Sequence, residues 1–109
     1  MTHTEYDVQP IDWKDIDLPK RFIIDNYAGT ENCVVCITDP GKRAGRFCCK
    51  LEGRRISFET YRRQGDKGPT MVREETYPSE ESAEMTFKVL KAVLESTSGR
   101  RNKTSFFSF

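Results

Sequence analysis

The residues of this chain with the clearest chemical potential are its four cysteines, which form two pairs, Cys33/Cys36 and Cys48/Cys49. A C-x-x-C spacing is used by zinc sites, and the second pair follows at a separation that compact zinc sites also use. The sequence CVVC, however, lies within a β-branched run, where side chains three positions apart point to opposite faces. We therefore expect small buried or half-buried thiols with no metal and no cofactor, while zinc ligation and a redox or disulfide role remain alternatives.

Catalytic groups are scarce elsewhere in the sequence. The only histidine is His3, so a Ser/His/Asp or Cys/His arrangement lacks its general base. The stretch GKRAGR at 41–46 does not match a phosphate-binding loop. Three acids, Glu80, Glu81 and Glu84, cluster at a predicted helix start, where dipole and capping effects account for them. We expect a protein without enzymatic activity.

Composition predicts one soluble domain. The chain has 109 residues and 12.6 kDa, with 36% hydrophobic and 32% charged residues. It contains no apolar run of the roughly 18 residues that span a bilayer, and its first residues lack a secretory signal pattern. These features predict an intracellular protein, cytoplasmic or nuclear, with no membrane association.

The net charge of +1 conceals an uneven distribution along the sequence. Residues 1–20 carry five acids and two bases, net −3, whereas residues 42–63 carry eight bases and two acids, net +6. Such a basic segment is either a solvated face with counter-charges nearby or a surface that binds polyanions.

Hydrophobic periodicity predicts an α+β fold. Four strands at 31–38, 46–52, 55–63 and 70–77 are separated by turn residues and form an antiparallel meander over about 31–77. A C-terminal amphipathic helix over about 79–97 begins at the N-cap Ser79 and covers one face of the sheet. Residues 1–30 form an irregular acidic arm, with a short strand near 21–25, that packs on or extends the sheet. Residues 98–109 form a basic and aromatic tail.

Alternation along the strands predicts a core face and an exposed face. The predicted core face contains Cys33, Val35, Ile37, Phe47, Cys49, Leu51, Ile56, Phe58 and Val72. The predicted exposed face contains Arg46, Cys48, Lys50, Arg55, Ser57, Glu59, Tyr61, Arg63, Arg73, Glu75 and Tyr77. Its arginines would neutralise phosphates, and its tyrosines would stack on unpaired bases.

Four antiparallel strands followed by one helix is an order of elements similar to that of the small single-stranded DNA-binding modules of the Whirly and PUR types. The chain contains none of the motifs of those families, so the similarity is one of architecture and transfers no residue.

We expect a small non-enzymatic homodimer that binds single-stranded DNA or RNA, or another polyanion. The predicted contact residues are Lys42, Arg43, Arg46, Lys50, Arg55, Tyr61, Arg63, Arg73 and Tyr77. The alternative is a protein-interaction module, an inhibitor or adaptor of a larger macromolecular machine, with an acidic protein among the partners that fit the sheet face. Such a module would dock through the sheet face, the acidic arm or the tail residues Phe106, Phe107 and Phe109.

Overall fold

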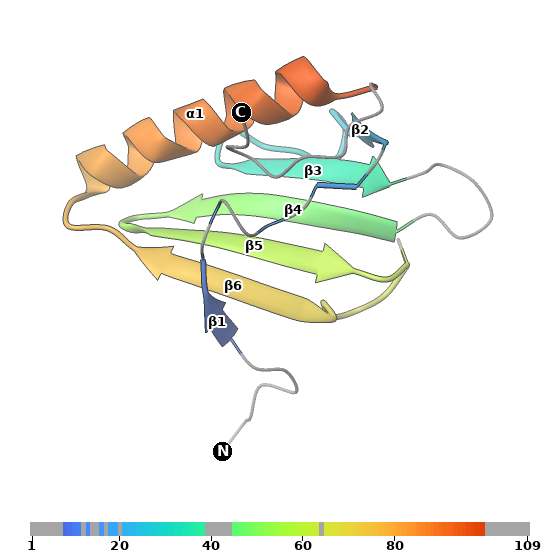
Figure 1. Ribbon diagram of the computed structural model, residues 1–109, viewed down its shortest axis with the longest axis horizontal. Helices are drawn as coiled ribbons and strands as arrows, with labels where there is room; N and C mark the ends of the chain where they lie inside the picture. The colour runs from blue at the N-terminus through green and yellow to red at the C-terminus, as the bar shows by residue number, and fades with distance from the viewer. Residues whose placement is uncertain are drawn as a thin grey trace.

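Six strands of the computed structural model form one sheet, and a C-terminal helix lies across it (Figure 1). The structure describes residues 8–11, 13, 16, 18–19, 21–38, 45–63 and 65–99. The strands are β1 (Val8–Pro10), β2 (Phe22–Ile24), β3 (Cys33–Thr38), β4 (Gly45–Glu52), β5 (Arg55–Tyr61) and β6 (Met71–Thr76), and α1 spans Glu80–Thr97.

The order of the strands in the sheet is β1-β6-β5-β4-β3-β2. Strands β2 to β6 form an antiparallel meander, and β1 pairs with β6 in parallel. The predicted α+β fold, a meander with a C-terminal helix, is confirmed. Of the two strands beyond the four of the predicted meander, β2 coincides with the short strand predicted near 21–25 and extends the sheet, whereas β1 was not predicted.

Two glycines permit the tight geometry of the central strands. Gly53 has a φ of +59°, which favours glycine, and it forms the turn between β4 and β5 with Arg54. A Cβ on Gly45 would lie 2.8 Å from the carbonyl oxygens of both Tyr61 and Arg62. Only glycine therefore allows the start of β4 to approach the end of β5 this closely.

Helix α1 begins and ends as its sequence indicates. The Ser79 hydroxyl accepts a hydrogen bond from the Ser82 backbone N–H at 3.1 Å, and the Ser79 N–H donates to the Ser82 hydroxyl at 3.3 Å. At the other end Gly99 adopts a φ of +81°, and its N–H donates to the Phe22 carbonyl at 2.7 Å. The end of α1 is therefore joined to edge strand β2.

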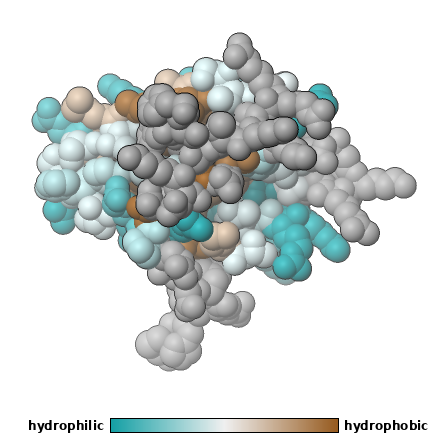
Figure 2. Space-filling view, in the orientation of Figure 1, coloured by the Kyte–Doolittle hydropathy of each residue, from teal (hydrophilic) through white to brown (hydrophobic). Residues whose placement is uncertain are grey.

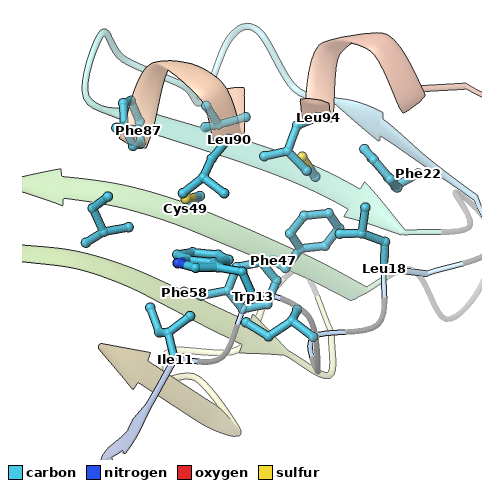
Figure 3. Packing of buried hydrophobic residues seen from close by; sticks show 14 residues of the cluster. Ile11, Trp13, Leu18, Phe22, Phe47, Cys49, Phe58, Phe87, Leu90 and Leu94 are labelled. Atoms are coloured by element: carbon cyan, nitrogen blue, oxygen red, sulfur yellow. The ribbon is translucent and has the colours of Figure 1, made fainter. Parts of the chain in front are cut away.

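The core lies between the sheet and two covering segments (Figure 3). Helix α1 contributes Phe87, Leu90 and Leu94, all at most 3% exposed. The described part of the chain between β1 and β2 contributes four further buried side chains, namely Ile11, Trp13, Ile16 and Leu18. This segment connects opposite edges of the sheet on the face that α1 also covers, so the chain before residue 24 completes the core.

Ring contacts connect these covering segments to the strands. The Phe47 and Phe58 rings are stacked with centroids 5.4 Å apart, and Phe22 meets Phe47 edge-on at 5.2 Å. Trp13 meets Phe58 at 6.2 Å with an interplanar angle of 89°. Such offset and edge-to-face pairs add to the stabilisation from burial alone.

The predicted faces of β3 and β6 are wrong. Cys33 pairs with Lys50 and Val35 with Cys48, so Cys33, Val35 and Ile37 lie on the face away from α1, whereas Val34 and Cys36 face the core. In β6, Arg73 pairs with the core residue Phe58, and Val72 pairs with Glu59. Every side chain of a strand changes face when its phase shifts by one residue. The run CVVCIT of β3 is apolar on both faces, so alternation did not show which face is buried. Strand β6 contains only one β-branched aliphatic residue, which is too few to reveal an alternating pattern.

Candidate functional site

The open face, meaning the face of the sheet away from α1, is the surface that the sequence predicted to be basic. Cross-strand register and alternation assign its residues. They are Ile23 from β2; Cys33, Val35 and Ile37 from β3; Arg46, Cys48, Lys50 and Glu52 from β4; Arg55, Ser57, Glu59 and Tyr61 from β5; and Val72, Glu74 and Thr76 from β6.

Carboxylates balance the cations of the open face. The Lys50 Nζ lies 2.8 Å from Glu59, whose hydrogen bond raises the pKa of the lysine. Arg55 contacts Glu74 at 3.0 Å and Glu52 at 3.4 Å. Arg46, Lys50 and Arg55 therefore face three carboxylates, Glu52, Glu59 and Glu74. The open face carries no net charge, in contrast to the predicted basic face.

Both predicted stacking tyrosines are already in contact with other side chains. The Arg46 guanidinium lies 4.1 Å from the centroid of the Tyr61 ring, a cation–π arrangement, and Tyr61 is only 9% exposed. The Tyr61 hydroxyl donates to Glu59 at 3.2 Å. Tyr77 is not on the open face: its hydroxyl accepts a hydrogen bond from the Trp13 Nε1 at 3.3 Å, and burial raises its pKa to about 12. Neither ring is presented for base stacking.

The four cysteines divide between the two faces. Cys36 and Cys49 are fully buried in the core, and burial raises the pKa of both, that of Cys36 to about 12. Cys48 is 4% exposed on the open face, and Cys33 beside it is partly exposed. Because Cys33 was predicted to face the core, Cys36, three positions along the strand, was expected to lie away from it, and both assignments are wrong. Within the described part of the chain, no three metal-ligating side chains come together.

Basic residues gather instead at one end of the sheet, which we call the basic end. It comprises Arg21, Arg46, Arg62, Arg63 and Lys67. This end contains the start of β2, the start of β4 and the connection between β5 and β6, because alternate connections of a meander lie on the same side. Figure 2 shows hydrophilic side chains on the right, the side on which the β5–β6 connection lies in Figure 1.

Most cations of the basic end are unpaired. Arg21, Arg62, Arg63 and Lys67 are exposed, and none forms an ion pair within the described residues. The buried Arg46 Nε has no hydrogen-bond partner there either. Asp66 is the one described carboxylate in this region, and it accepts a hydrogen bond from the Arg63 backbone N–H at 3.1 Å. Five cations and one carboxylate give a net charge of +4.

The opposite end of the sheet is richer in acids. The β4–β5 turn and the start of α1 meet there, with the Tyr77 N–H donating to the Arg54 carbonyl at 2.7 Å. Exposed carboxylates at this end include Glu52, Glu80 and Glu81. The charges are thus separated along the direction of the strands.

Apart from the two tyrosines described above, the predicted site residues fall into four groups. Arg46 and Arg63 lie at the basic end, whereas Lys50 and Arg55 are held in ion pairs on the open face. Arg73 projects from the other face of β6, where its Nε donates to the Met71 sulfur at 3.3 Å. The remaining predicted cations and the tail residues, Lys42, Arg43, Phe106, Phe107 and Phe109, lie outside the described residues.

The sequence prediction missed Arg21 and Arg62 as contact residues. Both immediately flank strands, so an argument from the alternation of faces did not select them. The predicted meander did contain a signal that would have found them. Alternate connections of a meander lie at the same end of the sheet, so residues that flank different strands meet there.

Comparisons with family models, with curated proteins and with solved structures found no match to this chain. Among the described residues, no helix is long and apolar enough to cross a membrane. Any function must therefore be argued from the geometry described above.

Proposed function

We propose that this protein is a non-enzymatic binding protein that contacts the phosphate backbone of nucleic acid through its basic end. The observation that carries the proposal is the group of four exposed cations, Arg21, Arg62, Arg63 and Lys67, with a single described carboxylate among them. Phosphates attract such cations, and the release of condensed counterions drives binding.

The spacing of these cations suits an extended ligand. Arg21 precedes β2 and Arg62 follows β5, and these strands are separated by β3 and β4. Three strand spacings of about 4.7 Å place the two cations about 14 Å apart across the sheet. A phosphate backbone lying across the strand ends would meet cations along this length.

The expected recognition is electrostatic. Tyr61 is covered by Arg46, and Tyr77 is engaged with Trp13, so neither of the two tyrosines expected to stack on unpaired bases is available for stacking. Base selectivity also needs contacts to base edges or stacked bases. We therefore expect DNA and RNA strands of different sequence to bind with similar affinity.

Salt dependence tests the proposal. If all five cations of the basic end neutralise phosphates, log K falls with log salt with a slope of about −3.5 for a single strand. Between about 50 and 200 mM salt the affinity then decreases about 130-fold. The double variant Arg62→Gln/Arg63→Gln loses two contacts, so its slope is about −2.1 and its decrease about 18-fold. Fluorescence anisotropy with a labelled oligothymidine measures both.

The matched control is Arg54→Gln/Lys88→Gln, which removes two exposed cations distant from the basic end. Its slope should equal that of the wild type. Absence of binding at low salt, or equal slopes for the two double variants, refutes the proposal.

A protein-interaction module is the second candidate function. It is supported by Met85 and Val89, which are 63% and 51% exposed and lie four residues apart on α1. Adjacent exposed apolar side chains are typical of contact surfaces. If these residues mediate the predicted homodimer, the double variant Met85→Ser/Val89→Ser should sediment as a monomer where the wild type sediments as a dimer. A monomeric wild type refutes self-association.

A further inference from the structure

A second, smaller apolar cluster lies on the open face and contains two of the four cysteines. Val35, Cys48 and Tyr61 are buried there, with partly exposed Cys33 packed against them. Cys33 lies opposite Lys50, and Cys48 lies opposite Val35. The two cysteines are therefore diagonal neighbours on adjacent antiparallel strands, with side chains on the same face.

The Cys33 side chain packs against the small cluster that contains Cys48. The Cys48 thiol hydrogen-bonds to the Cys33 sulfur, and this bond lowers the pKa of Cys33 to about 7, against the opposing effect of burial. Lys50 and Arg46 also favour the thiolate, whereas Glu59 disfavours it. The same hydrogen bond raises the pKa of Cys48, which remains a thiol. The lowered pKa favours the thiolate of Cys33, which is the nucleophilic form.

The two core cysteines lack these properties. Cys36 and Cys49 are fully buried, and burial raises the pKa of each. Buried thiols with a raised pKa react slowly with oxidants and alkylating agents in solution. Cys48 is also buried, but its proposed reaction is only with the neighbouring Cys33 sulfur, whereas Cys36 and Cys49 lie on the opposite face of the sheet. The protein thus contains a partly exposed acidic thiol beside a buried thiol, and two inert thiols that serve as internal controls.

We propose that Cys33 and Cys48 form a peroxide-reactive dithiol site, in which Cys33 is the nucleophile and Cys48 converts its oxidised form into an intramolecular disulfide. This site is independent of the basic end. Its substrate class is a hydroperoxide, the simplest member being hydrogen peroxide.

The reaction proceeds in two balanced steps. The Cys33 thiolate attacks one peroxide oxygen, the O–O bond breaks, and Cys33 becomes a sulfenic acid while hydroxide leaves and takes a proton to become water. The Cys48 sulfur then attacks the Cys33 sulfur, and the S–O bond breaks. The departing hydroxide combines with the Cys48 proton to form a second water. One peroxide is reduced to two waters as two thiols become one disulfide.

Because Cys48 lies beside Cys33 on the open face, the second step takes place within one molecule. Diagonal neighbours on adjacent antiparallel strands lie about 7–8 Å apart. A disulfide needs Cα atoms less than about 7 Å apart, so its formation requires β3 and β4 to shift slightly at this position. The bond would tie β3 to β4 beside the Lys50–Glu59 ion pair. A dithiol reductant restores the two thiols by exchange.

The test treats the full chain at neutral pH with hydrogen peroxide, followed by alkylation and peptide mass analysis. The wild type should lose two hydrogen atoms and yield a Cys33–Cys48 cross-linked peptide that a dithiol reductant cleaves. Cys48→Ser should stop at a Cys33 sulfenic acid, which a dimedone-type reagent traps. Cys33→Ser should not react, and Cys36→Ala/Cys49→Ala should form the disulfide as the wild type does, if it folds.

Three outcomes overturn the proposal. The first is a wild type that keeps four free thiols under peroxide. The second is a wild type in which Cys33 is over-oxidised without a disulfide, which shows that Cys48 does not resolve it. The third is a disulfide that joins any other pair or links two chains. The first two outcomes are measured on wild-type protein, so they do not depend on the folding of a variant.

Discussion

Replacing Leu90 with alanine tests whether α1 and the N-terminal arm share one core. Leu90 is 0% exposed and belongs to the same buried cluster as Trp13. Figure 3 shows it pointing from α1 towards the sheet between Phe87 and Leu94. Buried Leu→Ala changes cost about 2.7–5 kcal/mol, and the cost is highest where the surroundings cannot collapse. Because the sheet and its stacked rings are stiff, we expect about 4 kcal/mol.

Urea denaturation measures this effect with two independent probes. Trp13 is the only tryptophan, so its fluorescence reports on the arm, while far-ultraviolet circular dichroism reports largely on α1. With an m-value of about 2 kcal/mol/M, a loss of about 4 kcal/mol lowers the midpoint by about 2 M. The urea midpoint should shift by the same amount with both probes, because residues of both segments belong to one buried cluster.

The control is Met85→Ala, which changes a side chain that is 63% exposed on the same helix. We expect a change within about 0.5 kcal/mol. If Leu90→Ala shifts the circular dichroism midpoint but leaves the fluorescence midpoint unchanged, the arm unfolds separately and the shared-core argument is wrong.

Three further predictions concern capping and titration. Ser79→Ala removes the N-cap of α1 and should lower the free energy of unfolding by about 1 kcal/mol in urea denaturation, whereas an unchanged midpoint would contradict the cap. Lys50→Gln removes a cation that favours the Cys33 thiolate, so the pH at which Cys33 is half-alkylated by iodoacetamide should rise above about 7; a lower pH would refute this role. The pKa of Tyr77 is raised from 10.0 to about 12 in the folded protein, so its stabilising contribution is present below pH 10 and is lost as pH increases from 10 to about 12. The melting temperature of the wild type should therefore fall more steeply over that window than that of Tyr77→Phe, and equal slopes would contradict it.

Helices and strands whose apolar residues recur at regular intervals were predictable from the sequence. The buried residues of α1 (Ala83, Phe87, Leu90 and Leu94) recur at three- and four-residue intervals, and Ser79 and Gly99 mark its ends. The central strands β4 and β5 were assigned to the correct faces because their apolar and polar residues alternate, as in RISFETY. Local pattern suffices where one face of an element is apolar and the other is polar.

The candidate sites were less predictable, because each depends on contacts between segments distant in sequence. Arg21 and Lys67 reach one end of the sheet only through the pairing of β2 with β3 and of β5 with β6. The sum of charges along residues 42–63 overstated the charge of the open face for two reasons. Of the described bases in that range only Arg46, Lys50 and Arg55 lie on this face, and Glu74, which contacts Arg55 from β6, lies outside the range.

The sequence by itself determined the types of elements, their order and the limits of the helix, since these follow from periodicity, capping and turn residues. Tertiary structure decided the faces of β3 and β6, the edge strand β1, and the cover that Trp13 and its neighbours provide over the core. The reason is physical: a run that is apolar on both sides has no period to fix its phase, so cross-strand pairing sets it. That pairing places Cys33 beside Cys48 and sends Cys36 into the core.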